Sequence, residues 1–365
     1  MNVVLTPGMA GADGVAALSR LVVRALAQRM DPMIEALSLH DTTAPDFGSA
    51  AARVRFGGAA GSKTRLAAST LRAAARAGSD TQVICVHLHL GPLALPFVWR
   101  GARLTTILCG IEAWHPLSRL RASVLRRSET LVAISAHTAR RFQAANPAFA
   151  ARDVRVCHPA VPDEGAHCLS TPVRAESPPT ALIVGRMAAA ERYKGHDLLL
   201  DLWPRVRAQV PEAGLIVAGD GDDRVRIESR AASLQLTDRV RFVGRVSDAV
   251  LAGLYRDCTF FVMPSRDEGF GLVFLEAMRA GKACIGGSGA AAEIIEDNVT
   301  GLVVDPRQPE QVLSALLRLF QEVETRERMG RAAAERFART FTEAHFRERF
   351  RGVLGLQLEA TPRVR

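Results

Sequence analysis

Two glutamates flank a short glycine-containing loop in the second half of the chain, within the segment MPSRDEGFGLVFLEAMRAGK. Glu268 lies in the polar loop after an apolar, strand-like run, and Glu276 lies in the helical pattern that follows. The residues between the loop glutamate and the helical pattern are Gly269, Phe270 and Gly271. Backbone amides at such a helix start attract a phosphate or a polar sugar edge. A carboxylate suits the paired hydroxyls of a ribose because it accepts two hydrogen bonds at once. This segment therefore predicts a binding site for a phosphorylated, hydroxyl-rich ligand.

Two cations lie in the segment LIVGRMAAAERYKGHDLLL, upstream of the two glutamates. Arg186 directly follows a strand-like run, and Lys194 precedes a glycine and a helical pattern. Both positions fall at the carboxyl edge of the predicted sheet, where we expect them to face the Glu268 loop. Arginine offers a fork of donors and lysine a compact charge, a pair that suits a departing diphosphate.

Two further clusters carry metal-ligand residue types. Asp220, Asp222 and Asp223 form a pattern typical of some divalent metal sites, but they follow a strand and precede a helix, where aspartate usually caps the helix. His87 and His89 end a strand with no third ligand nearby in the sequence, which favours a structural or acceptor-lining role. We therefore expect no bound metal and no cofactor.

Short β-branched runs alternate with longer amphipathic stretches along the whole chain, a pattern typical of parallel strands joined by crossover helices. The predicted fold class is α/β, with two doubly wound Rossmann-like domains that face a cleft. The predicted boundaries are 1–165 for a first Rossmann-like domain, 166–179 for a Pro- and Ser-rich linker, 180–340 for a second Rossmann-like domain, and 341–365 for a C-terminal helix packing back on the first domain.

Composition excludes several classes of protein. With 365 residues, 48% of them apolar, the chain predicts a large core and no extended disorder. Its six cysteines show no C-x-x-C pair, which argues against a disulfide scaffold or a structural zinc site. Without a basic leader or a long apolar run, the expected location is the cytoplasm. The net charge of +9 belongs mainly to residues 1–172, which hold 19 basic and 11 acidic side chains (+8).

Four ordered blocks of the second half, including VGRMAAAERYKGHDLLL and AAAEIIEDNVTGLVVDP, resemble family-4 retaining glycosyltransferases of GT-B fold. The resemblance implies that 1–165 is an acceptor-binding domain and 180–340 a nucleotide-sugar-binding domain. It implies that Arg186 and Lys194 hold the nucleotide diphosphate, and that no metal is required. It also implies that Glu268 contacts the transferred sugar and Glu276 the ribose. The remaining implied contacts are the amides of Gly269, Phe270 and Gly271 to the sugar or phosphate, and Val243 beside the base.

The first half resembles the same family more loosely. GADGVAALSRLVVRAL is similar to its glycine-rich loop and first helix, with Gly14 at the turn and Asp13 where a second glycine is common. In the acceptor-side segment, Cys109 stands where the family has a histidine that helps to position the sugar. Either Cys109 takes this place or His115 supplies an imidazole by another route, and the sequence leaves both open.

The function implied is transfer of a hexose, of mannose or glucose type, from a nucleoside-diphosphate sugar to a lipid-linked glycan or polysaccharide precursor. The alternatives are a nucleotide-sugar epimerase and a non-catalytic protein that binds nucleotide sugar or nucleic acid, although no nucleic-acid-binding motif appears. The nucleotide, the sugar, the acceptor, the linkage and the oligomeric state stay open.

Segment 97–127 interleaves tryptophan and leucine with arginine, as in proteins that bind anionic membrane surfaces peripherally. A solvated arginine face explains this pattern equally well.

Overall fold

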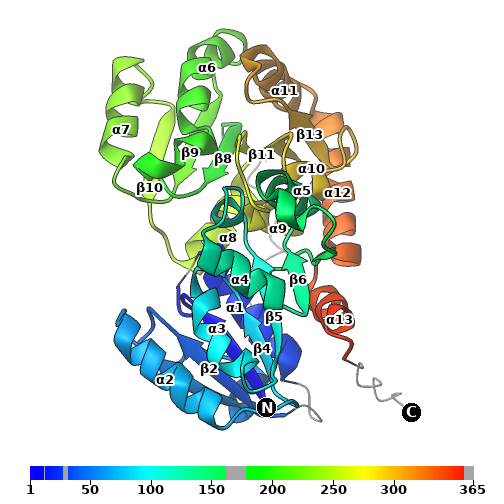
Figure 1. Cartoon of the computed structure of the whole chain (residues 1–365). Helices are drawn as coiled ribbons and strands as arrows, with labels where there is room; N and C mark the ends of the chain where they lie inside the picture. Colours follow the sequence, from blue (N-terminus) through cyan, green and yellow to red (C-terminus); the bar gives the residue numbers. More distant parts are fainter. Residues whose placement is uncertain (12, 28–31, 162–177, 357–365) are drawn as a thin grey trace, which may run out of the picture. The chain divides into compact units, whose positions relative to one another are not determined.

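The computed structural model describes residues 1–11, 13–27, 32–161 and 178–356 (Figure 1). The chain divides into two compact units, a first unit of Met1–Pro162 with Glu343–Arg365 and a second unit of Asp163–Thr342. Almost all of the predicted linker, 166–179, lies outside the described residues, as does Cys168. Each unit is described by itself.

A parallel sheet forms the centre of the first unit. In the described part of this unit its strand order is β3-β2-β1-β4-β5-β6-β7, and every neighbouring pair is parallel. The strands are β1 Asn2–Thr6, β2 Ile34–Ser38, β3 Val54–Gly58, β4 Gln82–Cys85, β5 Arg103–Leu108, β6 Thr130–Ala133 and β7 Val154–Val156. The central strands β1 and β4 are buried along their whole length, as expected for a sheet covered on both faces.

The helices of the first unit connect these strands. They are α1 Gly14–Leu26, α2 Lys63–Ala75, α3 Gly91–Val98, α4 Arg119–Arg127, α5 Ala136–Ala145 and α13 Glu343–Val353, with short 3-10 turns η1 Gly48–Arg53, η2 Leu88–Leu90, η3 Ile111–Ala113 and η4 Pro147–Phe149. Serine side chains cap α2, α4 and α5, which satisfies amides that the first helical turn leaves unpaired.

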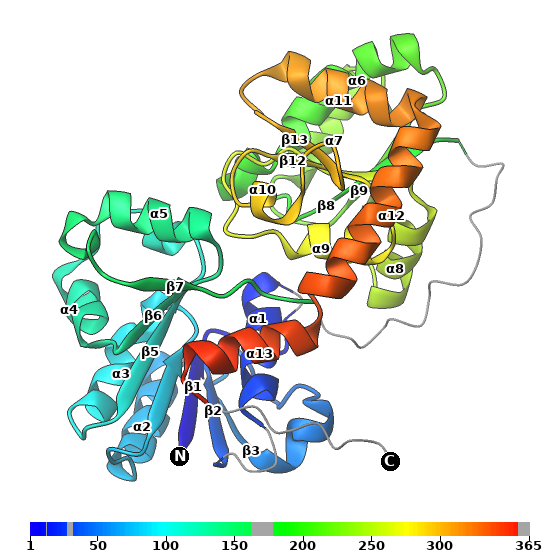
Figure 2. The same ribbon diagram turned by 90° about the vertical axis from the view of Figure 1, so that its right-hand side faces the viewer.

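The last helix, α13, belongs to the first unit although it lies at the end of the sequence. It packs against α1, and Figure 2 shows the two helices side by side. The Arg24 guanidinium pairs with the Glu343 carboxylate at 3.1 Å, and both side chains are largely buried. The buried Arg351 donates to the Ala25 carbonyl at 3.2 Å. Packing and buried polar contacts thus attach the C-terminal helix to the first unit.

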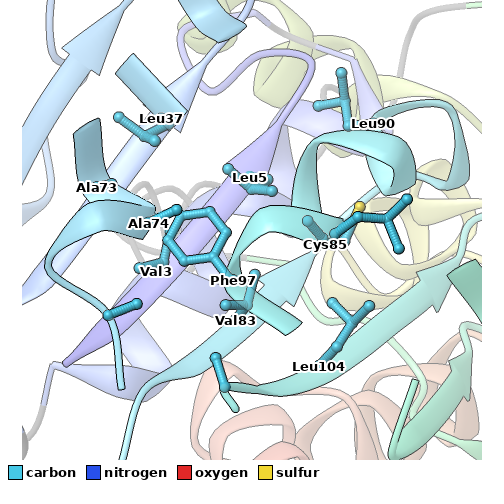
Figure 3. Close-up of a cluster of buried hydrophobic side chains, with 14 of the residues drawn as sticks. Val3, Leu5, Leu37, Ala73, Ala74, Val83, Cys85, Leu90, Phe97 and Leu104 are labelled. Carbon is cyan, nitrogen blue, oxygen red and sulfur yellow. The ribbon is translucent and has the colours of Figure 1, made fainter. Parts of the chain in front are cut away.

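The core of the first unit lies between the sheet and the helices α2 and α3. Figure 3 shows the Phe97 ring of α3 among Val3, Ala74 and Val83, all of them buried. Burying a phenylalanine or leucine side chain of this kind contributes about 1.5–3 kcal/mol. The core therefore fixes β1 and β4, whose carboxyl ends begin the loops toward Gly14 and His87.

The second unit repeats the architecture. Among its described residues the strand order is β10-β9-β8-β11-β12-β13, all parallel. The strands are β8 Thr180–Val184, β9 Gly214–Ala218, β10 Val240–Gly244, β11 Phe260–Met263, β12 Cys284–Gly287 and β13 Gly301–Val304. The helical elements are η6 Ala189–Lys194, α6 His196–Gln209, α7 Arg224–Ser233, α8 Asp248–Asp257, α9 Leu272–Arg279, α10 Ala291–Ile294, α11 Pro309–Gln321 and α12 Val323–Thr340. The predicted doubly wound α/β class is confirmed.

The strand order of the second unit reverses between β8 and β11, which are neighbours in the sheet. Such a reversal sends the two following loops to opposite faces and leaves a crevice at the carboxyl ends of the strands, where open α/β sheets bind ligands. The β8 loop carries Arg186 and Lys194, and the β11 loop carries Glu268. The topology therefore places the three residues at one strand edge.

Candidate functional site

The loops after β8 and β11 are connected by direct contacts. The Arg266 amide donates to the Tyr193 carbonyl at 2.9 Å. Gly195 has a φ of +96°, and a Cβ on it would lie 2.8 Å from the Pro264 ring. Only glycine allows this backbone conformation and this close approach together. Lys194 is thereby held beside the loop that carries Glu268.

Lys194 lies between two carboxylates. Its Nζ is 3.5 Å from Glu268 Oε2 and 3.6 Å from Glu191 Oε2, and all three side chains are mostly buried. Glu191 also forms an ion pair with Arg186, whose side chain is 66% exposed. The structure thus brings together the two predicted cations and the predicted loop glutamate. Two cations and two carboxylates in one cluster can exchange partners when an anionic ligand arrives.

Glu191 is a member of this cluster that the sequence analysis did not identify. Its Oε2 atom is buried without a hydrogen-bond partner, although the Lys194 ammonium lies within ion-pair distance. The backbone is non-helical at Glu191, with φ −119° and ψ 24°, so η6 is kinked there. A glutamate in a run of polar residues gives no local signal of this role, because its partners are found only once the loop folds.

A network of carboxylates and guanidinium groups connects the Lys194 loop to two helices. Asp223 accepts two hydrogen bonds from Arg192 and two from Arg226, at 2.6–2.9 Å. Arg226 also binds Asp197 of α6 through both of its terminal nitrogens, at 2.7 and 2.8 Å. Hydrogen bonds from Arg226 and Arg192 hold the pKa of Asp223 far below its usual range. The network joins η6, α6 and α7.

The aspartates after β9 were expected to cap α7, and this expectation is wrong. Asp223 occupies the N-cap position without a capping bond to the backbone amides of the helix, because its carboxylate binds the side chains of two arginines instead. Asp222 accepts from the Ala189 amide at 2.9 Å, and Asp220 accepts from its neighbour Gly221 at 2.9 Å. The described residues contain no group of three or more His, Cys, Asp or Glu side chains arranged to hold a metal ion.

The start of α9 contains the predicted amide site. Gly271 is the N-cap residue and has a φ of +101°, and a Cβ there would lie 2.7 Å from the Phe274 ring. The neighbouring Phe270 ring is 2% exposed and packs near Phe341, with the ring centres 6.3 Å apart. Gly269 is buried beside it. The side chain of Phe270 is therefore a core residue, so only its backbone remains for ligand contact.

Glu276 lies on α9 and is half-buried. The Tyr255 hydroxyl donates to its Oε2 at 2.7 Å. Burial raises the pKa of Glu276, and the tyrosine hydrogen bond opposes this shift. Val243 lies near the carboxyl end of β10, the outer strand of the sheet, two strands away from β8. The structure therefore groups Glu268, Lys194 and Arg186 directly and places Val243 farther along the same edge.

In the first unit, Gly14 is the first residue of α1, and Asp13 caps this helix. The Asp13 carboxylate accepts from the Val15 and Ala16 amides at 2.9 and 3.0 Å. These two amides of the helix start already have an anionic partner, which explains the aspartate in a loop where glycine was expected. A phosphate at this helix start would compete with that carboxylate.

Cys109 and His115 differ in their surroundings. The Cys109 thiol donates to the Val86 carbonyl at 2.8 Å, and burial raises its pKa well above its ordinary value. Cys109 is thus a protonated, structural thiol at the carboxyl end of β5. His115 is exposed, and its carbonyl accepts from the Asn146 side-chain Nδ2 at 3.2 Å.

The bond from Cys109 to Val86 places this thiol next to the segment that carries His87 and His89. The two imidazole rings pack edge to face, with their centres 4.7 Å apart, and the His89 amide donates to His87 Nδ1 at 3.3 Å. Burial, with the nearby Arg121 charge, lowers the pKa of His87 to about 4, so this imidazole is neutral at physiological pH. The carboxyl edge of the first unit therefore carries two imidazoles close to Cys109.

Comparisons with known proteins agree with this geometry. Residues 171–336 match the family model "Glycosyl transferases group 1". A GDP-mannose-dependent alpha-(1-6)-phosphatidylinositol monomannoside mannosyltransferase of Mycobacterium tuberculosis is 32% identical over 255 residues, which cover 64% of this chain and 65% of that protein. The chain thus matches about two thirds of that relative's length. An alpha-D-kanosaminyltransferase of Streptomyces kanamyceticus is 31% identical over 157 residues, which cover 43% of this chain and 40% of that protein.

Solved structures extend the likeness to nearly the whole chain. The Anabaena protein HepE in complex with UDP and glucose superposes with a TM-score of 0.75 and 18% identity, covering 97% of this chain and 99% of that one. Sucrose-phosphate synthase from Thermosynechococcus elongatus superposes with a TM-score of 0.76 and 19% identity, covering 97% of this chain and 98% of that one. At this identity the likeness concerns the fold. Together with the family match, it shows that the chain has the GT-B fold and that residues 171–336 are a domain of the group 1 glycosyltransferase family.

Proposed function

We propose that the chain transfers a hexose, of mannose or glucose type, from a nucleoside-diphosphate sugar to a lipid-linked glycan or polysaccharide precursor. The observation that carries this proposal is the cluster at the β8–β11 reversal, where Lys194 lies 3.5 Å from Glu268 and Arg186 pairs with Glu191, the second carboxylate beside Lys194. The M. tuberculosis relative is named as GDP-mannose-dependent and HepE was solved with UDP, so both nucleotides are candidates.

In the proposed reaction the bond between the sugar C1 and the diphosphate oxygen breaks, and the acceptor hydroxyl oxygen forms the new bond to C1. Arg186 and Lys194 stabilise the negative charge that develops on the departing diphosphate. The acceptor proton passes to the departing phosphate oxygen, so no separate base is needed. Glu268 orients the sugar, and Glu276 binds the ribose. Attack on the face from which the diphosphate leaves retains the anomeric configuration.

We also propose that the reaction needs no divalent metal, because the two cations supply the charge that a metal would otherwise provide. Asp222 and Asp223, the residues that most resemble metal ligands, already bind a backbone amide and two arginines. A metal ion would have to displace these partners. Turnover that persists in EDTA is the expected result.

A thermal-shift series with UDP, GDP, ADP and their sugars, in magnesium and in EDTA, tests donor binding. A ligand that binds only the folded state raises its stability by mass action. We expect one nucleotide to raise the melting temperature equally in magnesium and EDTA, and the rise to disappear in Glu276→Ala. No shift with any nucleotide contradicts the proposal, and binding without consumption of the sugar nucleotide favours a non-catalytic binding protein.

Retention is tested on the product. Proton NMR of the newly formed glycoside, recorded early in the reaction, gives its anomeric configuration directly. We expect the configuration of the donor, and an inverted product contradicts the mechanism above.

The proposed acceptor side includes peripheral binding to anionic membranes through the helices α3 and α4, which pack together. Trp99 follows α3 and is 72% exposed, and Leu120 on α4 is 53% exposed. Arg119, Arg126 and Arg127 on α4 are also exposed. No helix in the described part of the chain combines the length and apolar character needed to cross a bilayer. Flotation with vesicles rich in phosphatidylglycerol, against pure phosphatidylcholine vesicles, tests the idea; equal recovery with both contradicts it.

A further inference from the structure

Tyr255 is a buried side chain whose hydroxyl points at the predicted ribose-binding glutamate. It is 3% exposed, and its Oη donates to Glu276 Oε2 at 2.7 Å. A buried hydroxyl needs a hydrogen-bond partner, and a bond to a carboxylate is stronger than a neutral one. The sequence analysis assigned Tyr255 no role, because its partner is 21 positions away on the next helix.

The position of the Tyr255 hydroxyl is set by the core. Its ring packs against Phe261 of β11 at 5.9 Å between ring centres, and Phe261 packs edge to face on Phe274 of α9 at 5.3 Å. The Cys258 thiol donates to the Tyr255 carbonyl at 3.3 Å, at the end of α8. Three elements therefore fix the donor, while the acceptor residue Glu276 on α9 is half-buried.

The tyrosine hydrogen bond engages only one of the two oxygens of the Glu276 carboxylate. Oε2 accepts the tyrosine hydrogen bond, which restrains rotation of the carboxylate and leaves Oε1 as the oxygen available to a ligand. The same bond favours the charged form, because it lowers the pKa of Glu276 against the effect of burial. Of the other charged groups near this carboxylate, Arg279 also lowers its pKa and Asp248 raises it. A carboxylate oxygen held in a fixed position is an acceptor that suits a sugar hydroxyl.

We propose that Tyr255 is a positioning residue that holds Glu276 in the orientation needed to recognise the ribose hydroxyls of the donor, so that the site selects ribonucleotides over 2′-deoxyribonucleotides. This inference rests on the proposed function, since it gives the selectivity of the same donor site. A site built to accept a hydroxyl hydrogen bond discriminates against a ligand that lacks it, provided that the acceptor cannot turn away to another partner. Tyr255 supplies that restraint from the core.

The test compares dissociation constants for UDP and 2′-deoxy-UDP, and for GDP and 2′-deoxy-GDP, by calorimetric titration of the full chain. For the nucleotide that the wild type binds, we expect the ribose form to bind about tenfold tighter than the deoxy form, as for one hydrogen bond to a charged group. Tyr255→Phe keeps the packed ring and removes the hydroxyl. We expect its preference to fall to about twofold, mainly through weaker binding of the ribose form.

Ser247→Ala is the control for general loosening of α8. Ser247 caps this helix by accepting from the Val250 amide at 3.4 Å, a hydrogen bond to the helix backbone that does not involve Glu276. We expect this variant to melt earlier and to keep the ribose preference of the wild type. A preference that survives in Tyr255→Phe, or that Ser247→Ala loses equally, overturns the inference.

The pH dependence provides a second readout that a merely structural role would not change. Removing the tyrosine hydrogen bond raises the pKa of Glu276, so any remaining ribose preference of Tyr255→Phe is lost at a higher pH than in the wild type as the pH is lowered. If the ribose preference of Tyr255→Phe is lost at the same pH as that of the wild type, the inference is wrong. Failure of the proposed function is distinguishable, because the wild type then binds neither UDP nor GDP.

Discussion

Asp223→Ala is the substitution that most directly probes how the Lys194 loop is held. The Asp223 side chain is 5% exposed and accepts four hydrogen bonds from Arg192 and Arg226. Loss of the carboxylate leaves Arg226 paired with Asp197, whereas Arg192, about half exposed, loses its partner and turns to water. The aspartate is thus the element that ties η6 to α7.

The cost follows from these contacts. Hydrogen bonds to charged groups contribute about 1.5–3 kcal/mol each, but four bonds to one carboxylate are not additive. Because Arg226 keeps Asp197 and Arg192 can turn to water, no buried charge is left unpaired, and the loss stays at the upper end of the range for hydrogen bonds to one charged group. We therefore expect a loss of about 3 kcal/mol in the free energy of unfolding, which lowers the melting temperature by about 6–12 °C for a domain of this size.

Urea unfolding at several pH values measures this loss. Because the pKa of Asp223 is depressed in the folded state, its contribution is present above the ordinary aspartate value of 3.8 and is lost as the pH falls below it. The difference between wild type and Asp223→Ala should therefore be constant near neutral pH and shrink in acid.

Asp238→Ala is the matched control, since Asp238 also binds both terminal nitrogens of an arginine, at 3.1 Å, but its side chain is 57% exposed. Exposed pairs contribute about 0–1 kcal/mol. If Asp223→Ala costs no more than Asp238→Ala, the network does not support the loop and the reasoning fails.

Three further predictions concern other parts of the chain. Glu191→Gln removes a carboxylate that lies 3.6 Å from Lys194 Nζ and competes with the diphosphate for this cation. Loss of a competing Coulomb interaction of about 1 kcal/mol should make binding of the nucleoside diphosphate about fivefold tighter, as measured by calorimetry. Unchanged or weaker binding contradicts the exchange of partners. Cys109→Ala should reduce turnover less than about threefold, because the thiol is buried and protonated, and a loss of a hundredfold would show that it acts on the substrate. Gly219→Ala places a Cβ 2.0 Å from a carbonyl oxygen at φ +132°, so it should lower the unfolding free energy by more than about 2 kcal/mol in urea, whereas the control Gly352→Ala, with open space in α13, should not.

The sequence predicts the buried strands of both sheets well, because apolar β-branched runs bounded by polar loops have few alternatives. In the first half, apolar runs predict strands at 2–6, 82–87, 104–108 and 130–134, and none of these runs corresponds to β2, β3 or β7. β3 and β7 are edge strands whose residues are half-buried or exposed, and β3 contains two glycines, so neither shows the apolar run of a central strand. β2 is largely buried, but a glutamate interrupts its apolar pattern.

For the candidate site, strand-end positions identified Arg186, Lys194 and Glu268, because parallel topology sends consecutive loops to one edge. The side chains that support them could not be predicted in the same way. Tyr255, Glu191 and the partners of Asp223 are found only when separate helices and loops meet, and no local pattern encodes which charges will pair. The capping expectation for the aspartates was wrong for this reason.

The central claim is that Lys194 lies at the diphosphate of the donor. Consumption of GDP-mannose and UDP-glucose in the presence of EDTA and a lipid-linked acceptor, by the wild type and by Lys194→Ala, tests it most directly. Loss of one preorganised charge donor typically lowers kcat by 10²–10³. We predict that the wild type consumes one of the donors and that Lys194→Ala is at least about a hundredfold slower, with a melting temperature within a few degrees. Wild-type turnover in Lys194→Ala would contradict the account.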